Sequence, residues 1–398
     1  MQLYDVCIIG GLGHMGLPLG LSLANTGKRV LLYDIDRKAM DIVSRGRMPF
    51  MELGAEEILC KVLGKTLFLS SEKDQISSSR FIFITIGTPV DRHLNPRYNM
   101  FIEFFSGIVG LLRDGQHLIL RSTVFPGTTE KIRGILEKHA LKVRVSFCPE
   151  RIAEGKAMEE LRSLPQIIGS FDEASFDEVK ELFLPFNKDV VFLTPTEAEL
   201  AKLFTNSWRY IQFSIANQFY QISCQHGVDF YRIYDSITYN YPRAKGFPRA
   251  GFAAGPCLFK DTMQLAAFSN NTFFLGHAAM LINEGLPNFI VQNLKEKYSL
   301  RDKVVGILGM AFKADSDDSR ESLSYKLKKI LEIEAKAVYC TDPYIKDTTT
   351  LPLDQVLKLA DILILGAPHA VYRDLQIDST FKIVVDVWNF FGKGGLVW

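Results

Sequence analysis

Cys257 is the side chain best placed for covalent chemistry in this chain of 398 residues. It leaves a loop of small residues that ends at Gly255, and it precedes a predicted helix with Lys260 and Asp261 in its first turn. A helix N-terminus and nearby charges can lower the pKa of a thiol and favour the nucleophilic thiolate. An isolated cysteine is more often a packing residue, but the loop and the charges favour a reactive thiol here.

Two further pairs of polar residues have a spacing of four. Glu150 and Glu154 follow a predicted strand, and Lys202 and Asn206 lie on a long predicted helix, where residues four apart share one face. Each pair also has a plainer interpretation, because the two acids could be solvated and the lysine and asparagine could be a surface pair. The segment 122–129 is rich in Ser and Thr and could be only a helix cap.

A glycine turn follows the first predicted strand, residues 4–10. Gly11, Gly13 and Gly16 allow a tight turn, the approach of a pyrophosphate to backbone N–H groups, and close packing of the helix that follows. Asp34 ends the second strand, where a carboxylate accepts from a ribose 2′-hydroxyl and repels a 2′-phosphate. The pattern predicts a dinucleotide site that prefers NAD to NADP.

Elements of the α/β type must position these groups. Strands are predicted at 81–86, 117–120 and 143–147, and each one ends in a polar or glycine-containing turn. In doubly wound sheets ligands bind outside the carboxyl ends of the strands, so these turns are expected to line one crevice. The turns are residues 87–89, 122–123 and 148–150.

The middle of the chain is helical and the last hundred residues repeat the opening theme. A long helix is predicted at 197–226, and a second helical stretch runs from 260 to 297 with interruptions at Gly276, Gly285 and Pro287. Strands at 303–309, 337–342 and 360–368 then resemble the first domain. We predict two Rossmann-like, doubly wound α/β domains joined by a helical middle, with domains at 1–195, 196–299 and 300–398.

Composition excludes several function classes. Lys and Arg number 46 and Asp and Glu 45, so net charge offers no general attraction to nucleic acid or anionic lipid. The six cysteines are scattered, which argues against a disulfide scaffold and a structural zinc site, and we expect no metal. We also expect a soluble, cytoplasmic protein, because no apolar run is long enough for a membrane span and no leader is recognisable.

Taken in order, these segments resemble the UDP-glucose/GDP-mannose dehydrogenase family over nearly the whole chain. Members of that family oxidise the C6 alcohol of a nucleotide sugar to a carboxylate with two NAD+. The shared motifs are the glycine turn, Gly87-Thr88-Pro89, Ser122-Thr123-Val124, Pro149-Glu150 with Glu154, Lys202 with Asn206, Cys257-x-x-Lys260-Asp261, Ala311-Phe312-Lys313, Asp317-Asp318-x-Arg320 and Thr341-Asp342-Pro343.

The resemblance implies a role for each matching residue. Cys257 would hold the aldehyde as a thiohemiacetal and then as a thioester, Lys202 and Asn206 would stabilise oxyanions, and residues 246–254 would wrap the nucleotide sugar. The implied set is Cys257, Lys202, Asn206, Asp261, Glu154 and Thr123 for catalysis; Gly11, Gly13, Gly16, Asp34, Thr88, Thr123, Lys260 and Arg320 for NAD; and Glu150, Glu154, Lys202, Asn206, Phe247, Ala254 and Lys313 for the substrate.

The choice of sugar rests on markers that disagree. Glu150 followed by Arg151 resembles the N-acetylhexosamine branch of the family, whereas Glu154 and Lys260 resemble the glucose and mannose branch. We favour a UDP-hexose of the UDP-glucose type, with a UDP-N-acetylhexosamine (GlcNAc or ManNAc) as the alternative. Ala254 adds a methyl group where the family usually has glycine, so the sugar pocket is expected to differ.

The sequence also bears on two other functions and on assembly. The glycine turn is also similar to that of β-hydroxyacid dehydrogenases, which carry out a two-electron oxidation with a lysine, but the terminal Rossmann-like repeat favours the first family. A catalytically silent nucleotide-sugar binder is disfavoured by the full set of candidate residues. The helix at 197–226 is too long to be buried within one small domain, so we expect a homodimer formed through it.

Overall fold

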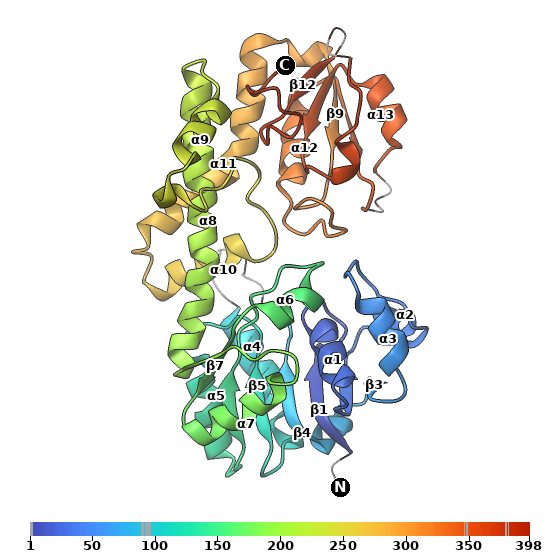
Figure 1. Cartoon of the computed structure of the whole chain (residues 1–398), viewed down its shortest axis with the longest axis vertical. Helices are drawn as coiled ribbons and strands as arrows, with labels where there is room; N and C mark the ends of the chain where they lie inside the picture. Colours follow the sequence, from blue (N-terminus) through green and yellow to red (C-terminus); the bar gives the residue numbers. More distant parts are fainter. Residues whose placement is uncertain are drawn as a thin grey trace. The chain divides into compact units, whose positions relative to one another are not determined.

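The computed structural model describes residues 3–88, 91, 97–345, 347, 349–378, 380 and 382–398. The chain forms two compact units, Met1–Thr205 and Asn206–Trp398. One continuous helix, α8 (Pro195–Gln225), begins in the first unit and ends in the second (Figure 1). Within the described residues, no helix is both long and apolar enough to cross a membrane.

The first unit is built on a sheet of eight strands in its described part. Their order is β3-β2-β1-β4-β5-β6-β7-β8, and all neighbours are parallel except β6 and β7. The order of the first six is that of a dinucleotide-binding sheet, which confirms the predicted fold class. The strands are β1 (Tyr4–Ile9), β2 (Val30–Tyr33), β3 (Leu67–Ser70), β4 (Ser79–Ile84), β5 (His117–Leu120), β6 (Arg144–Phe147), β7 (Gln166–Ser170) and β8 (Val190–Leu193).

The central strands of this sheet are apolar because helices cover both of their faces. In β1, Val6 and Ile8 enter one hydrophobic cluster with α1, α3 and α7, whereas Cys7 and Ile9 enter a second cluster with α4 and α5. The helices are α1 (Gly16–Asn25), α2 (Arg37–Ser44), α3 (Ala55–Val62), α4 (Tyr98–Ser106), α5 (Thr128–Lys138), α6 (Ala157–Ser163) and α7 (Glu173–Phe183), with 3₁₀ turns η1 (Lys73–Ser78) and η2 (Val109–Leu111).

The helical part of the second unit differs from the prediction in one respect. The stretch predicted from 260 to 297 breaks once, between α10 (Leu258–Phe268) and α11 (Phe274–Lys297), where Asn270 and Asn271 adopt φ of 53° and 60°. The predicted interruptions at Gly276, Gly285 and Pro287 are wrong, because α11 runs through all three. Burial of this helix outweighs the backbone hydrogen bond that a proline removes. The remaining elements are α9 (Phe230–Thr238) and η3 (Pro242–Ala244).

The second unit ends in a smaller parallel sheet of Rossmann type. The order of its described strands is β10-β9-β11-β12, with α12 on one face and α13 on the other (Figure 1). This arrangement confirms the predicted repeat of the opening theme. The elements are β9 (Val304–Leu308), α12 (Leu323–Glu334), β10 (Ala337–Thr341), α13 (Leu353–Leu359), β11 (Ile362–Leu365) and β12 (Ile383–Val385), with η4 (Leu300–Asp302) and η5 (Ala370–Tyr372).

Candidate active site

The glycine turn after β1 brings backbone segments into close contact. A Cβ added to Gly16 would lie 2.4 Å from the carbonyl oxygen of Gly10, and one added to Gly11 would lie 2.8 Å from Cβ of Leu32. Side chains at these two positions would force the helix and the strand apart. The first and third glycines of the predicted fingerprint are therefore required by packing.

The same turn fits a dinucleotide. Among the described residues, a Cβ added to Gly13 would meet only the Gly10 carbonyl oxygen, at 3.6 Å, so this backbone is open to a ligand. Asp34 follows β2 and accepts one backbone hydrogen bond on each carboxylate oxygen, from Leu12 (2.9 Å) and Asp36 (3.0 Å). Both oxygens keep lone pairs for ribose hydroxyls, and no side chain caps the described N-terminus of α1, which suits a pyrophosphate.

The turns after β4 and β5 contact each other directly. Thr88 Oγ1 donates to the carbonyl oxygen of Thr123 (2.5 Å), and Ser122 Oγ donates to that of Ile86 (2.7 Å). The sequence predicted that these turns share one edge of the sheet, and the structure brings them together there. Pro89, the last residue of the first predicted motif, lies outside the described residues.

Glu150 is held by a partner that the sequence did not single out. Its Oε2 forms an ion pair with Arg121, whose side chain is fully buried and also donates to Cys148 O (3.2 Å) and Gln166 Oε1 (3.1 Å). Its Oε1 accepts from the backbone N–H of Arg151 (2.8 Å). The carboxylate is therefore fixed in place after β6, and its contact with the sugar stays a prediction.

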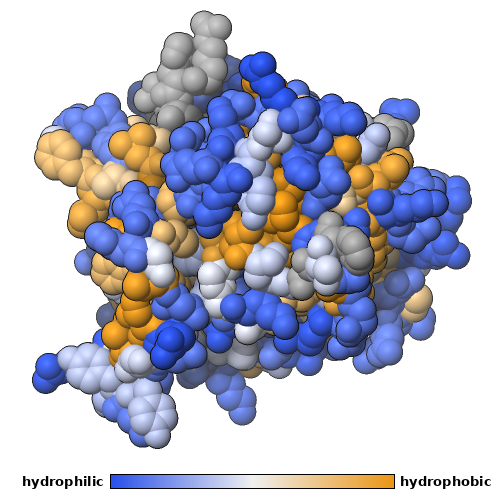
Figure 2. All heavy atoms as spheres, turned by 90° about the horizontal axis from the view of Figure 1, so that it is seen from above, coloured by the Kyte–Doolittle hydropathy of each residue, from blue (hydrophilic) through white to orange (hydrophobic). Residues whose placement is uncertain are grey.

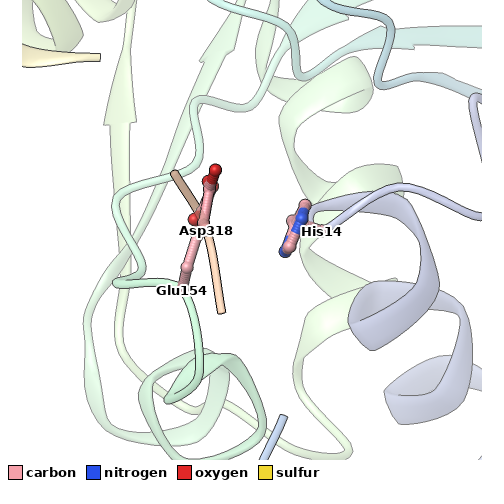
Figure 3. Close-up of side chains that lie close together, drawn as sticks. All are labelled: His14, Glu154 and Asp318. Carbon is pink, nitrogen blue, oxygen red and sulfur yellow. The ribbon is translucent and has the colours of Figure 1, made fainter. Parts of the chain in front are cut away.

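Glu154 lies beside the glycine turn. A ring nitrogen of His14 is within 4.8 Å of a Glu154 carboxylate oxygen, and Figure 3 shows the two side chains close together. The His14 ring stacks on Phe50, with 4.0 Å between the ring centroids. The loop that carries Glu154 is held by Glu52, which accepts from the backbone of Gly155 (3.0 Å). Asp318, the third side chain drawn in Figure 3, belongs to the second unit.

The start of α8 is anchored to the loop that follows Thr123. Glu199 is buried and accepts from the backbone N–H groups of Gly127 (2.6 Å) and Thr129 (2.8 Å) and from the Thr129 hydroxyl (2.6 Å). This contact caps α5 with a carboxylate from a distant helix. Lys202 lies one turn further along α8 and is largely buried. The sequence missed Glu199, although its spacing of three from Lys202 places it on the same face.

In the second unit, Cys257 precedes the first residue of α10. The backbone N–H of Asp261 donates to its carbonyl oxygen (2.9 Å), so the thiol and this carboxylate are one helical turn apart. Asp261 is buried, and its Oδ2 accepts from Asn206 Nδ2 (2.6 Å) while its Oδ1 pairs with Lys260. The structure therefore groups four predicted residues, and Lys260, predicted to contact NAD, is bound to Asp261.

The remaining predicted residues lie in two loops of the second unit, one between η3 and α10 and one between β9 and α12. Arg320 pairs with the buried Asp318 through Nε, 2.9 Å from both carboxylate oxygens. Lys313 Nζ lies 5.6 Å from the ring centroid of Phe312. The Phe247 ring stacks on a neighbouring tyrosine and Ala254 packs against the hydrophobic core, so the segment 246–254 is well anchored. Their contacts with NAD or the substrate stay predictions.

The sequence matches three domains described for one family. They are the NAD-binding domain (residues 4–187), the central domain (196–284) and the UDP-binding domain (306–393) of the UDP-glucose/GDP-mannose dehydrogenase family. The three matches leave only short segments of the chain uncovered.

Individual relatives align over nearly their whole length. A UDP-N-acetyl-D-mannosamine dehydrogenase of Pyrococcus horikoshii is 28% identical over 397 residues, which cover 95% of this chain and 94% of the relative. The solved structure of a UDP-D-ManNAc dehydrogenase from that organism has a TM-score of 0.87 at 27% identity, covering 94% of this chain and 91% of that one. A UDP-glucose dehydrogenase structure from Pyrobaculum islandicum has a TM-score of 0.91 at 25% identity, covering 99% and 98%. The chain belongs to the UDP-glucose/GDP-mannose dehydrogenase family and is an NAD-dependent nucleotide-sugar dehydrogenase.

Proposed function

We propose that the chain oxidises the C6 hydroxyl of a UDP-N-acetylhexosamine, of the UDP-N-acetyl-D-mannosamine type, to the uronate. The observation that carries the four-electron reaction is the group of Cys257, Asp261 and Asn206 at the start of α10. The choice of sugar rests on the relatives, because those from Pyrococcus horikoshii and Methanococcus maripaludis are both UDP-N-acetyl-D-mannosamine dehydrogenases.

This choice corrects the preference drawn from the sequence. We favoured the UDP-glucose type, and the comparisons support the N-acetylhexosamine alternative better, in line with Glu150 and Arg151. UDP-glucose is kept as the second candidate, because the structure of a UDP-glucose dehydrogenase from Pyrobaculum islandicum matches with a TM-score of 0.91.

The reaction proceeds in three chemical stages. When bound, NAD+ would supply the hydride acceptor for both oxidations. The C6 alcohol first loses a hydride and a proton to become an aldehyde, and the Cys257 thiol adds to it to form a C–S bond. The resulting thiohemiacetal loses a second hydride and proton to become a thioester, and water then breaks the C–S bond. Each catalytic cycle consumes one water, transfers two hydrides, releases three protons and restores the thiol.

The residues around Cys257 have separate tasks in this proposal. The N-terminus of α10 favours the thiolate, because its backbone N–H groups and dipole stabilise negative charge. Asp261, oriented by Asn206 and Lys260, orients the water and receives a proton. Holding the aldehyde on one sulfur prevents its release between the oxidations.

Residues of the first unit would bind the dinucleotide and stabilise negative charge on the substrate. The glycine turn and Asp34 would hold the dinucleotide, as the geometry of both allows. Lys202 would stabilise the alkoxide and the tetrahedral oxyanion, and Thr123 and Glu154 would orient water and move protons.

A homodimer through α8 is also proposed. Large apolar side chains on this helix are exposed at spacings of three, four and seven: Phe204, Trp208, Ile215, Phe219 and Ile222, each at least 39% exposed. Figure 2 shows hydrophobic residues, interspersed with hydrophilic ones, on the side where Figure 1 draws α8, α9 and α11, and further hydrophobic residues elsewhere on the same face. A second copy of α8 would cover such a stripe.

The assembly is tested by mass in solution. The wild-type chain is expected at twice the 45.0 kDa of one chain, and Phe219→Glu is expected to yield monomers. Ile333→Glu, at an exposed position on α12, serves as the matched control that should stay dimeric. A monomeric wild-type chain contradicts the dimer.

The proposed substrate is tested by an NADH-release panel. The purified chain is mixed with NAD+ and, in turn, UDP-N-acetylmannosamine, UDP-N-acetylglucosamine, UDP-glucose, UDP-galactose and GDP-mannose. The highest kcat/KM is expected for UDP-N-acetylmannosamine. A higher value for UDP-glucose would restore the first preference, and no response to any of the five would overturn the proposal.

A further inference from the structure

A buried asparagine on α8 holds the loop that leads to Cys257. Asn217 is fully buried, and its Oδ1 accepts from the backbone N–H of Gly251 (2.8 Å) while its Nδ2 donates to the Gly251 carbonyl oxygen (3.0 Å). One side-chain amide thus binds both polar backbone groups of one residue, as a neighbouring strand would. Gly251 lies six residues before the thiol.

The orientation of this amide is fixed from a second side. Asn217 Nδ2 also donates to Oδ1 of Asn283 on α11 (2.9 Å), and Asn283 Nδ2 donates to the Tyr210 carbonyl oxygen on α8 (3.0 Å). Asn283 is fully buried as well. Both the oxygen and the nitrogen of the Asn217 amide therefore have hydrogen-bond partners. A flipped amide would place its nitrogen against the Gly251 N–H and its oxygen against the Gly251 carbonyl oxygen.

Two aromatic rings pack closely against the loop that precedes Cys257. Gly251 has φ of 152°, and a Cβ there would lie 2.1 Å from the Trp388 ring. Gly255 has φ of 102°, and a Cβ there would lie 2.6 Å from the Phe312 ring. The backbone before Cys257 is thus confined between an asparagine on α8 and rings of the C-terminal sheet domain.

We propose that Asn217 is a positioning residue that sets the place of the sugar-binding loop and, through it, of the Cys257 thiol. The inference rests on the proposed role of Cys257 and of the segment 246–254. The asparagine touches no reacting atom, and it acts by fixing the backbone at Gly251. Its buried polar contacts satisfy both polar backbone groups of Gly251, which lies outside the described strands.

The test exchanges one donor for an acceptor without changing the shape of the side chain. Asn217→Asp replaces Nδ2 by a carboxylate oxygen that faces the Gly251 carbonyl oxygen and Asn283 Oδ1, so the loop must shift. Gln116→Glu is the matched control: Gln116 is buried in the first unit, accepts from Arg113 N (2.8 Å), and donates to the carbonyl oxygens of Ser79 (2.7 Å) and Ser77 (3.3 Å).

The readouts separate positioning from stability. Both variants are expected to unfold at a lower temperature than the wild type. At a temperature where all are folded, Asn217→Asp is expected to lower kcat/KM for the UDP-sugar at least 10-fold with the KM for NAD+ within 2-fold, and to change the rate of Cys257 alkylation by iodoacetamide at least 3-fold. Gln116→Glu should leave all three values within 2-fold.

Gly251→Ala perturbs the same backbone from the side of the Trp388 ring, and it is expected to give the same pattern as Asn217→Asp. Wild-type kinetics and alkylation in a folded Asn217→Asp protein would overturn the inference. A different result, full turnover by Cys257→Ser, would overturn the proposed function. Alkylation, mapped by mass spectrometry on the wild type and on the variants, does not depend on turnover.

Discussion

Glu178 on α7 is expected to carry a large share of the stability of the first unit. Its carboxylate accepts hydrogen bonds from His117 Nδ1 (2.9 Å), Arg144 (2.6 Å) and Arg80 (2.5 Å). The His117 ring is fully buried, and its Nε2 lies 2.8 Å from Ser146 Oγ. The hydrogen bond from His117 and those from the two arginines lower the pKa of Glu178 from 4.5 to about 2.

The size of the effect follows from this shift. A fall in pKa from 4.5 to about 2 corresponds to ~3 kcal/mol of stabilisation at neutral pH. The side chains of Arg80 and Arg144 are 52% and 53% exposed, so solvent and salt screen part of it. We expect Glu178→Gln to lower the free energy of unfolding by about 2 kcal/mol at pH 7.

The sign of the pH dependence is fixed by the direction of the shift. Because the pKa of Glu178 is lower in the folded chain, its stabilisation is present above pH 4.5 and is lost as the pH falls toward 2. The difference between the wild type and Glu178→Gln should therefore narrow by about half between pH 7 and pH 3.

The assay is urea unfolding followed by far-UV circular dichroism. All three tryptophans, Trp208, Trp388 and Trp398, belong to the second unit, so their fluorescence follows that unit separately. Glu181→Gln, an exposed carboxylate on the same helix, is the control and should change stability by less than about 0.5 kcal/mol. A Glu178→Gln difference as small as that of the control, or one that does not narrow at pH 3, would show that the ionised Glu178 does not stabilise the first unit.

Three further changes test the anchors of the first unit. Arg121→Met leaves the Glu150 carboxylate buried without its cation and should cost about 3–5 kcal/mol in urea unfolding, with part recovered when Glu150→Gln is added; no recovery would contradict the ion pair. Glu199→Gln loses the ionised acceptor for the backbone N–H of Gly127 and should cost about 1–3 kcal/mol, and an unchanged melting temperature would contradict the cap. Asp34→Ala should weaken NAD+ binding about 10-fold in calorimetry, or roughly 1.4 kcal/mol, and equal affinity would contradict a ribose contact.

Much of the fold was predictable because burial on both faces leaves a clear pattern. β1 alternates between two hydrophobic clusters, so its run of apolar residues can hardly be anything but a covered strand. The break between α10 and α11 was predicted at the wrong place, because glycine and proline were taken as helix breakers although tertiary packing keeps them within α11. Asn270 and Asn271 carried the signal, since asparagine tolerates the left-handed conformation found there.

The candidate site was predictable in its residue types and less so in its partners. Asn206 and Asp261 are 55 positions apart, and only the fold reveals the hydrogen bond between them. Arg121 and Asn217 were missed because a single arginine or asparagine has no sequence signal of its own. The spacing along α8 did hold information, since Asn217 lies eleven residues, or three helical turns, after Asn206.

We propose that one chain carries out both oxidations, the second of them on an intermediate bound to the Cys257 sulfur. The most direct measurement is the number of NADH molecules formed per UDP-N-acetylmannosamine consumed, for the wild type and for Cys257→Ser. Two NADH per uronate are expected for the wild type, and no net uronate is expected for Cys257→Ser. One NADH per sugar, or full turnover without the thiol, would contradict it.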